Sequence, residues 1–221
     1  MDLTKIKLVI FDWDGTVMDS IGKIVVSLQQ AATRVNLPVP AAAQAKQIIG
    51  LSLDPAFQRL FPKSSQQQRD ELSEHYKDVY LNHDNTPTPL FPDAHELFDA
   101  LRQHGYLLSV ATGKARRGLD RMMSETNTEH YFHSSRCSDE AESKPHPDML
   151  QQLLVHHQLK PWQAVMVGDT VHDLAMAQAI DMPRIGITHG VHGPADFAPH
   201  EPSAVVHSLA ELRKLLTSRA S

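Results

Sequence analysis

The sequence predicts an α/β fold, in which a doubly wound parallel sheet forms the core and a helical segment is inserted after the first strand. Three observations lead to this prediction. Short apolar runs recur along the chain, amphipathic helical patterns lie between most of them, and one long segment near the N-terminus holds helical patterns only. Strands that alternate with helices are typical of a parallel sheet covered on both faces.

The strands are predicted from apolar runs of strand length. These runs are Leu8 to Phe11, Leu107 to Ala111, Ala164 to Val167, Arg184 to Ile187 and Ala204 to Val206. The first three are apolar along most of their length instead of alternating with polar residues. That pattern is expected of strands that are buried on both faces of a parallel sheet.

Helical patterns lie between and after these runs. They are DAHELFDALRQHG (93–105), HPDMLQQLLVHH (146–157), HDLAMAQAI (172–180) and SLAELRKLLTS (208–218). In the first of them Leu97, Phe98 and Leu101 share one face, and Gly105 is a typical helix stop. We therefore expect each to pack an apolar face on the sheet.

The segment from about Ser20 to Asn82 shows no strand pattern. It contains helical stretches from Ile21 to Val35 and from Gln66 to Leu81, and a proline-rich run, NTPTPLFP (85–92), follows it. Such a run is typical of a linker. We predict two domains: a catalytic core formed by residues 1–17 and 90–221, and a helical cap domain formed by residues 18–89.

Composition narrows the class of protein. The chain has 221 residues, of which 41% are apolar, and a formal net charge of -5, which argues against a nucleic-acid partner. Cys137 is the single cysteine, so no disulfide forms within the chain.

The N-terminal apolar run is too short for a signal peptide, and no run is long enough to cross a membrane. We expect a cytoplasmic protein without a membrane partner, and leave open whether it is a monomer or a dimer.

Polar residues follow three of the predicted strands. They are Asp12 and Asp14 after the first, Thr112, Gly113 and Lys114 after the second, and Asp169 and Asp173 after the third, with Lys144 before the helix that leads to the third. In open α/β sheets ligands bind at the carboxyl ends of strands, so these residues are expected to lie together.

This set of residues predicts a metal and a phosphoryl group. Carboxylates crowded together repel one another unless a cation lies between them. An all-oxygen ligand set suits a hard cation such as Mg²⁺. A hydroxyl, backbone N–H groups and a lysine suit a phosphate.

The sequence also resembles a known family. FDWDGT, ATGK, SKPHPD and VGDTVHD are similar, in order and spacing, to the four motifs of the haloacid dehalogenase-like (HAD) phosphohydrolases. The most similar group is the one that contains phosphoglycolate phosphatase and β-phosphoglucomutase. The resemblance runs from Phe11 to about Asp173, with a similar final strand region. It implies a Rossmann-like core with a helical cap.

The resemblance implies a role for each motif residue. Asp12 would be the nucleophile and Asp14 the general acid and base. Mg²⁺ would be bound by Asp12, the backbone carbonyl of Asp14, and Asp169. The remaining roles are phosphate binding by Thr112, Gly113 and Lys144, and support of the metal's waters or of Lys144 by Asp173.

These roles describe a Mg²⁺-dependent phosphatase that hydrolyses a small soluble phosphomonoester, phosphoglycolate-like or a sugar phosphate. A carboxylate that attacks phosphorus forms an aspartyl-phosphate and divides one difficult hydrolysis into two easier steps. A cap over the site would limit substrate size and exclude water. Lys46, Gln47 and Arg59 are polar cap residues that could contact the rest of the substrate, and the sequence does not rank them.

Several alternatives compete with this interpretation. A calcium loop beginning at Asp12 would need glycine and glutamate where Val17 and Lys23 stand. A dehalogenase would not need Asp14. A non-enzymatic binding protein on the same fold could lose Asp12, Asp14, Lys144 or Asp169 without penalty, yet all four are present.

Two further alternatives are a phosphomutase and a zinc site. β-Phosphoglucomutase carries Gly-x-Ser-Arg early in its cap, where this chain has GLSL (50–53) and so lacks the arginine. The 14 histidines include the adjacent His156 and His157, and His189 and His192 in a loop, without a zinc motif.

Overall fold

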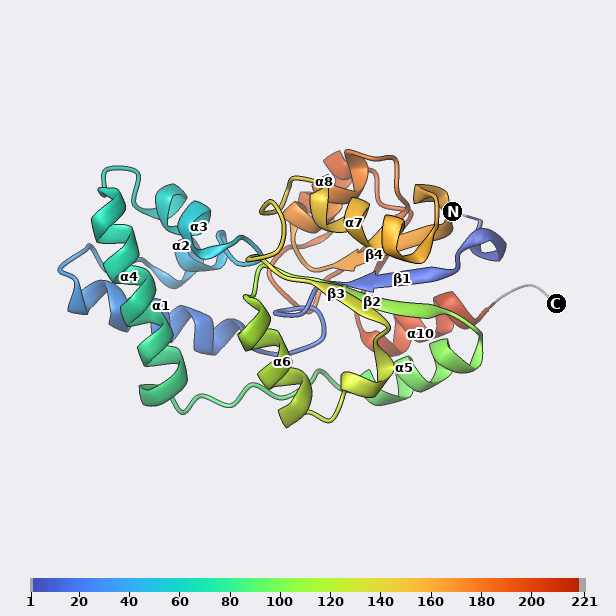
Figure 1. Cartoon of the computed structure of the whole chain (residues 1–221), viewed down its shortest axis with the longest axis horizontal. Coiled ribbons are helices and arrows are strands. Elements are labelled where there is room, and N and C mark those ends of the chain that lie inside the picture. The colour runs from blue at the N-terminus through green and yellow to red at the C-terminus, as the bar shows by residue number, and fades with distance from the viewer. Residues whose placement is uncertain (1, 219–221) are drawn as a thin grey trace.

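The fold has a central parallel sheet with helices on both faces and a helical insertion at one end, as Figure 1 shows. This computed structural model describes residues 2–218. The predicted α/β class, with a Rossmann-like core and helices inserted after the first strand, is confirmed. None of the helices in the described residues is both long and apolar enough to cross a membrane.

The sheet has six parallel strands in the order β3-β2-β1-β4-β5-β6. They are β1 (Leu8–Phe11), β2 (Leu107–Ala111), β3 (Ser134–Arg136), β4 (Ala164–Gly168), β5 (Arg184–Ile187) and β6 (Ala204–Val206). The order reverses between β1 and β4, and ligands bind at such a switch point in doubly wound sheets.

The register brings three strand ends to the same level. Phe11 is paired with Val110 of β2 on one side and with Val167 of β4 on the other. The next amide, that of Asp12, donates to the Val167 carbonyl at 2.9 Å. The residues that follow β1, β2 and β4 therefore emerge side by side at one edge of the sheet.

Two layers of helices bury the sheet. In Figure 1, α5 (Ala94–Gln103), α6 (Arg116–Glu125) and α10 (Leu209–Thr217) cover one face, and α7 (Asp148–His157) and α8 (Val171–Gln178) cover the other. Strand side chains alternate between the two apolar clusters, so Val9 and Phe11 lie in one and Leu8 and Ile10 in the other. Short helical turns complete the core: η1 (Leu3–Lys5), η3 (Glu129–Tyr131), η4 (Pro161–Gln163), α9 (Pro194–Phe197) and η5 (Ala198–His200).

The five strands predicted from apolar runs are all present, but β3 was missed. Its sequence is Ser-Ser-Arg, and all three residues are half-buried at the edge of the sheet. The Ser134 hydroxyl hydrogen-bonds to the Ser109 hydroxyl at 2.8 Å and to His157 Nε2 at 2.7 Å. Because the side chains of this edge strand are polar and hydrogen-bonded, the sequence contains no apolar run that would predict it.

The helical insertion comprises α1 (Ile21–Arg34), α2 (Ala42–Lys46), α3 (Leu53–Leu60), α4 (Gln66–Asp78) and the π-helical turn η2 (Val79–His83). It has an apolar cluster of its own, which includes Leu28, Phe57 and Leu72. At its base Met18 and Leu90 form an antiparallel bridge. The predicted domain division into residues 18–89 and the rest stays a prediction.

The insertion touches the core through the loop that precedes α3. The Ser52 amide donates to the Ser143 hydroxyl at 3.0 Å, and His172 Nε2 donates to the Gln47 carbonyl at 3.4 Å. Gly113 lies so close to this loop that a Cβ there would be 2.6 Å from the Gly50 carbonyl oxygen and 2.8 Å from that of Leu51. The contact therefore requires glycine at position 113.

We expect Gly113→Ala to loosen this contact without unfolding either part. A methyl group cannot fit against two backbone oxygens, so the loop must move away and the Ser52 amide must lose its protection. Hydrogen exchange followed by mass spectrometry should show faster exchange around residues 48–53. The control is Gly22→Ala in α1, where the nearest atom is 4.0 Å from the new Cβ and the substitution should stabilise the helix by up to about 1 kcal/mol. Unchanged exchange in Gly113→Ala would contradict this description of the contact.

Candidate active site

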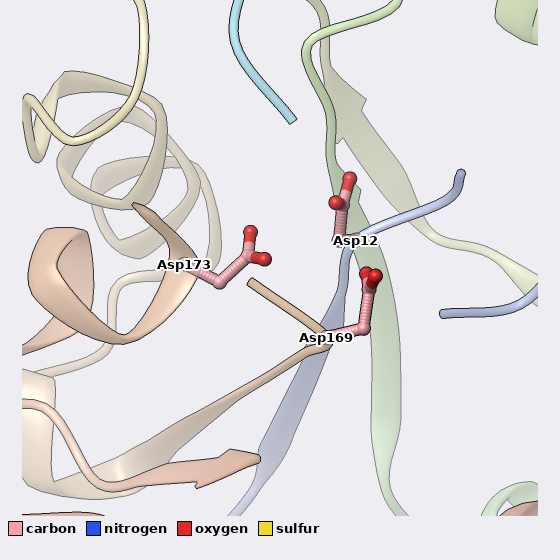
Figure 2. Close-up of side chains that lie close together, drawn as sticks. All are labelled: Asp12, Asp169 and Asp173. Atoms are coloured by element: carbon pink, nitrogen blue, oxygen red, sulfur yellow. The ribbon is translucent and has the colours of Figure 1, made fainter. Parts of the chain in front are cut away.

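Three carboxylates lie close together where β1 and β4 end, and Figure 2 shows the Asp173 side chain pointing toward those of Asp12 and Asp169. Asp12 directly follows β1, Asp169 directly follows β4, and Asp173 lies in the first turn of α8. One ligand atom from each lies within 4.8 Å of the other two, and all three residues are buried. The sheet register creates this cluster, because it places the ends of β1 and β4 beside each other.

Lys144 partly neutralises the cluster. Its ammonium lies 2.8 Å from Asp12 Oδ1 and 2.6 Å from Asp173 Oδ1, and its side chain is fully buried. Burial opposes the charged form of this lysine, but the charges of Asp12 and Asp173 outweigh burial and raise its pKa. Lys144 therefore carries its positive charge throughout the neutral range.

The two oxygens of Asp12 differ. Oδ1 accepts hydrogen bonds from Lys144 and, at 2.7 Å, from the amide of Trp13. Oδ2 is buried and has no hydrogen-bond partner among the described residues. Burial raises the pKa of Asp12 well above its ordinary value, although Lys144 acts in the opposite direction. An unpartnered carboxylate oxygen in a buried site is available to a cation or to an electrophile.

Asp169 is fixed by the loops around it. Its Oδ1 accepts from the Thr16 hydroxyl at 2.8 Å, and its Oδ2 accepts from the Val191 amide at 2.9 Å. Burial, with the charge of Asp173 added, raises the pKa of Asp169 to about 7. Gly15 has φ of +83°, and a Cβ there would lie 2.4 Å from Asp169 Oδ2, so the glycine of FDWDGT is needed for both reasons.

Asp173 has two structural tasks. Its Oδ2 accepts from the amide and the hydroxyl of Thr170, which caps the start of α8, while its Oδ1 holds Lys144. The resemblance implied support of the metal's waters or of Lys144. The structure shows the hydrogen bond to Lys144, and the other oxygen of the same carboxylate is engaged at the start of α8.

Asp14 does not belong to the three-carboxylate cluster. Its Oδ1 accepts from the Ser20 hydroxyl at 2.7 Å, and its Oδ2 lies 3.1 Å from the Lys114 ammonium. Both oxygens of Asp14 therefore have partners that lie outside the cluster. The contact that the sequence predicted between the backbone carbonyl of Asp14 and the metal stays a prediction.

A cavity of about 290 Å³ opens between the core and the insertion. On the core side its wall includes Asp12, Asp14, Thr112, Gly113 and Lys114, so residues from the first two motifs border one space. Thr112 Oγ1 accepts from the Lys114 amide at 3.2 Å. The predicted phosphate ligands Thr112 and Gly113 thus line the same cavity as the predicted nucleophile, and their binding of phosphate stays a prediction.

Known proteins share this sequence and fold. Residues 9–187 match the sequence profile of the haloacid dehalogenase-like hydrolase family. The chain belongs to this family. It is 29% identical to "Phosphoglycolate phosphatase" of Vibrio vulnificus (strain YJ016) over 96% of both chains, and 30% identical to "Probable phosphatase IndB" of Dickeya dadantii (strain 3937) over 93% of this chain and 91% of that one.

A solved structure with the same fold is a predicted phosphoglycolate phosphatase from Haemophilus somnus 129PT. Its TM-score is 0.86 at 24% identity, over 96% of this chain and 98% of that one. The resemblance to HAD-like hydrolases that the sequence motifs indicated is therefore confirmed, and so is the prediction that this chain is an enzyme.

The histidines of this HAD-like hydrolase have structural partners. His189 stacks on Phe91 with ring centroids 3.7 Å apart and donates to the Thr16 carbonyl, and His192 accepts from the Val171 amide. Burial lowers the pKa of both imidazoles. No histidine belongs to the one group of potential metal ligands found within residues 2–218.

Ser20 is a site residue that sequence reasoning missed, and Lys114 was expected near the site but was given no role. Both hold Asp14, one on each oxygen. Lys114 is the last residue of ATGK and lies just after a predicted strand. That position indicates that it lies near the site, but not that it pairs with Asp14. Ser20 gave none, because its hydroxyl reaches Asp14 only through the turn that the chain makes before α1.

The carboxylate cluster of the hydrolase fits a hard divalent cation. When all three carboxylates are ionised, Lys144 balances only one of them, and Asp12 Oδ2 has no donor. Oxygen ligands of this kind suit Mg²⁺. Asp12 and Asp169 are the residues that would hold the ion, since Asp12 Oδ2 has no donor and Asp169 accepts from neutral donors only, whereas Asp173 is paired with the Lys144 ammonium.

Binding of Mg²⁺ should depend on pH in a defined direction. In the metal-free hydrolase the pKa of Asp169 is raised from 3.8 to about 7, so the folded state holds a proton that the unfolded state releases between these values. The contribution of Asp169 to metal-free stability should therefore fall as pH rises from about 4 to 7. Mg²⁺ competes with that proton, and at about 100 times its Kd it adds about 2.7 kcal/mol, or about 5–10 °C in Tm.

We expect this Mg²⁺-induced rise in Tm at pH 8 and a much smaller one at pH 5.5, measured by differential scanning calorimetry. Asp169→Asn should remove most of the rise at pH 8, whereas Asp181→Asn, at an exposed position, should keep it. An equal rise at both pH values would contradict the assignment.

Proposed function

We propose that this hydrolase is a Mg²⁺-dependent phosphatase that acts on a small phosphomonoester through a phosphorylated Asp12. The observation that carries the proposal is the asymmetry of Asp12. Lys144 and the Trp13 amide hold its Oδ1, whereas its buried Oδ2 is unpartnered and its residue borders the cavity. The relatives named as phosphatases support the same reaction class.

In the first step a carboxylate oxygen of Asp12 attacks phosphorus, and the bond from phosphorus to the ester oxygen breaks. Asp14 gives its proton to the leaving alkoxide. In the second step Asp14 takes a proton from water as that water attacks phosphorus, and Asp12 is released with inorganic phosphate. Asp14 is held for both transfers by Ser20 and Lys114.

Positive charge and donors must stabilise the transferring group. Lys144 supplies one charge beside Asp12. The Thr112 hydroxyl and the Gly113 amide border the same cavity, and the Gly113 amide forms no hydrogen bond within the described residues. A Mg²⁺ ion held by Asp12 and Asp169 would add charge stabilisation of the phosphoryl oxygens.

The helical insertion supports the role of a cap. Its loop at Gly50 and Leu51 lies against Gly113, and several of its side chains form the wall of the cavity opposite Asp12. We propose that residues 18–89 form this cap domain and that it excludes water from the phosphoryl group.

The phosphomutase alternative is less well supported. A mutase holds a second phosphate, and the sequence comparison placed Leu53 where β-phosphoglucomutase carries arginine. Leu53 borders the cavity, so the chain has an apolar side chain there where the mutase has a cation. Water is then the acceptor of the phosphoryl group.

Replacement of Asp12 tests the proposal. Asp12→Asn keeps the shape of the side chain but removes the nucleophilic carboxylate, so phosphate release from p-nitrophenyl phosphate should fall by at least about 10³-fold. Asp70→Asn, at an exposed position of α4, should keep full activity. Circular dichroism and Tm would establish that both variants are folded. Activity of Asp12→Asn above a few per cent of the natural enzyme would overturn the assignment.

A further inference from the structure

We propose that the organic part of the substrate is apolar, so that the enzyme prefers phosphate esters of short branched alcohols to esters that carry a second anionic group. This inference rests on the proposed function, since it names the substrate class of the same site. Its basis is the contrast between the two walls of the cavity. One wall is charged and the other is apolar.

The apolar wall comes from the helical insertion. It is formed chiefly by Ile24, Leu28, Ile48, Ile49, Leu53 and Phe57. The charged wall comes from the core and carries Asp12 and Asp14. A phosphoryl group at Asp12 therefore directs the rest of the substrate away from the sheet and into a space bounded by aliphatic and aromatic side chains.

The cavity provides no free buried cation for a second anionic group. Two lysines are among its lining residues. Lys114 is already paired with Asp14 at 3.1 Å and lies over the Tyr80 ring at 5.1 Å from its centroid. Lys77 is exposed to solvent on α4. A buried carboxylate without a partner is costly, so a second negative charge is disfavoured here.

The other polar side chains on the insertion wall are neutral. They are Ser73 and Tyr76. Burial raises the pKa of the Tyr76 hydroxyl well above its ordinary value, so this group stays uncharged. Such residues can accommodate one hydroxyl or carbonyl oxygen, but they do not balance a charge.

The polar residues that the sequence suggested for this contact lie elsewhere. Lys46, Gln47 and Arg59 are exposed, and none of them borders the cavity. Gln47 instead presents its backbone carbonyl to His172. The surface that faces the substrate is thus the apolar side of α1 and α3.

Two nearly isosteric substrates test the inference. Isobutyl phosphate and 2-phosphoglycolate have similar shapes, with two methyl groups in the first where the second has carboxylate oxygens. Glycolate is the better leaving group, so a preference for isobutyl phosphate must come from binding. We expect kcat/KM to be at least about tenfold higher for isobutyl phosphate. From ethyl to propyl to butyl phosphate it should rise about fourfold per methylene, which corresponds to about 0.8 kcal/mol.

A pair of variants on one helix tests the wall itself. Ile24→Gln places an amide on the cavity wall and should lower kcat/KM for isobutyl phosphate about fivefold or more, with a smaller loss for methyl phosphate. Val26→Gln, two residues away and 36% exposed, does not line the cavity and should leave both values unchanged.

Binding of matched phosphonates separates this inference from the proposed function. In isothermal titration with Mg²⁺ present, 3-methylbutylphosphonate should bind more tightly than 3-phosphonopropionate, with a negative heat-capacity change. Phosphate release that depends on Asp12 but is faster with 2-phosphoglycolate, or tighter binding of 3-phosphonopropionate, would overturn the inference alone. Tighter binding of 3-methylbutylphosphonate without release of phosphate from any ester would overturn the proposed function and leave the apolar subsite in place.

Discussion

The site depends on one buried ammonium group. Lys144 lies 2.8 Å from Asp12 and 2.6 Å from Asp173, and without it three buried carboxylates would face one another with no positive charge among the described residues of the cluster. Loss of one partner from a buried ion pair typically costs about 3–5 kcal/mol. The lysine also joins three parts of the chain, because it connects the segment before α7 to the end of β1 and to α8. Folding and chemistry therefore rest on the same contacts.

The cavity near that lysine has a charged wall, which comes from the core, and a mostly apolar wall, which comes from the insertion. The strand ends gather carboxylates and donors at the switch point of the sheet, and glycines such as Gly15 allow the backbone to approach Asp169 closely. The helical insertion contributes the opposite wall, which is mostly aliphatic. In the proposed function, the phosphoryl group would meet the core and the remainder of the substrate would meet the insertion. We therefore propose that the sheet edge determines the reaction type and that the insertion determines the choice of substrate.

Much of this arrangement could be predicted from the sequence, because strand ends in a parallel sheet converge whatever the details of packing. Asp12, Asp169 and Lys144 were predicted to meet on that ground, and they do. What was missed has physical reasons. The polar edge strand β3 has no apolar pattern. Ile24 and Leu53 look in the sequence like ordinary helix core, and only the packing of the insertion against the core shows that they face a cavity.

The central claim is that Asp12 carries the phosphoryl group, and trapping that group tests it most directly. Asp14→Asn with p-nitrophenyl phosphate suits the experiment, because this leaving group needs no proton whereas the water that attacks afterwards needs a base. The intermediate should accumulate in this variant. Acid quench after milliseconds, proteolysis and mass spectrometry should locate a phosphoryl group that hydroxylamine removes on the peptide containing Asp12. A phosphoryl group on a different residue, or continued release of phosphate with none bound to the protein, would contradict the account.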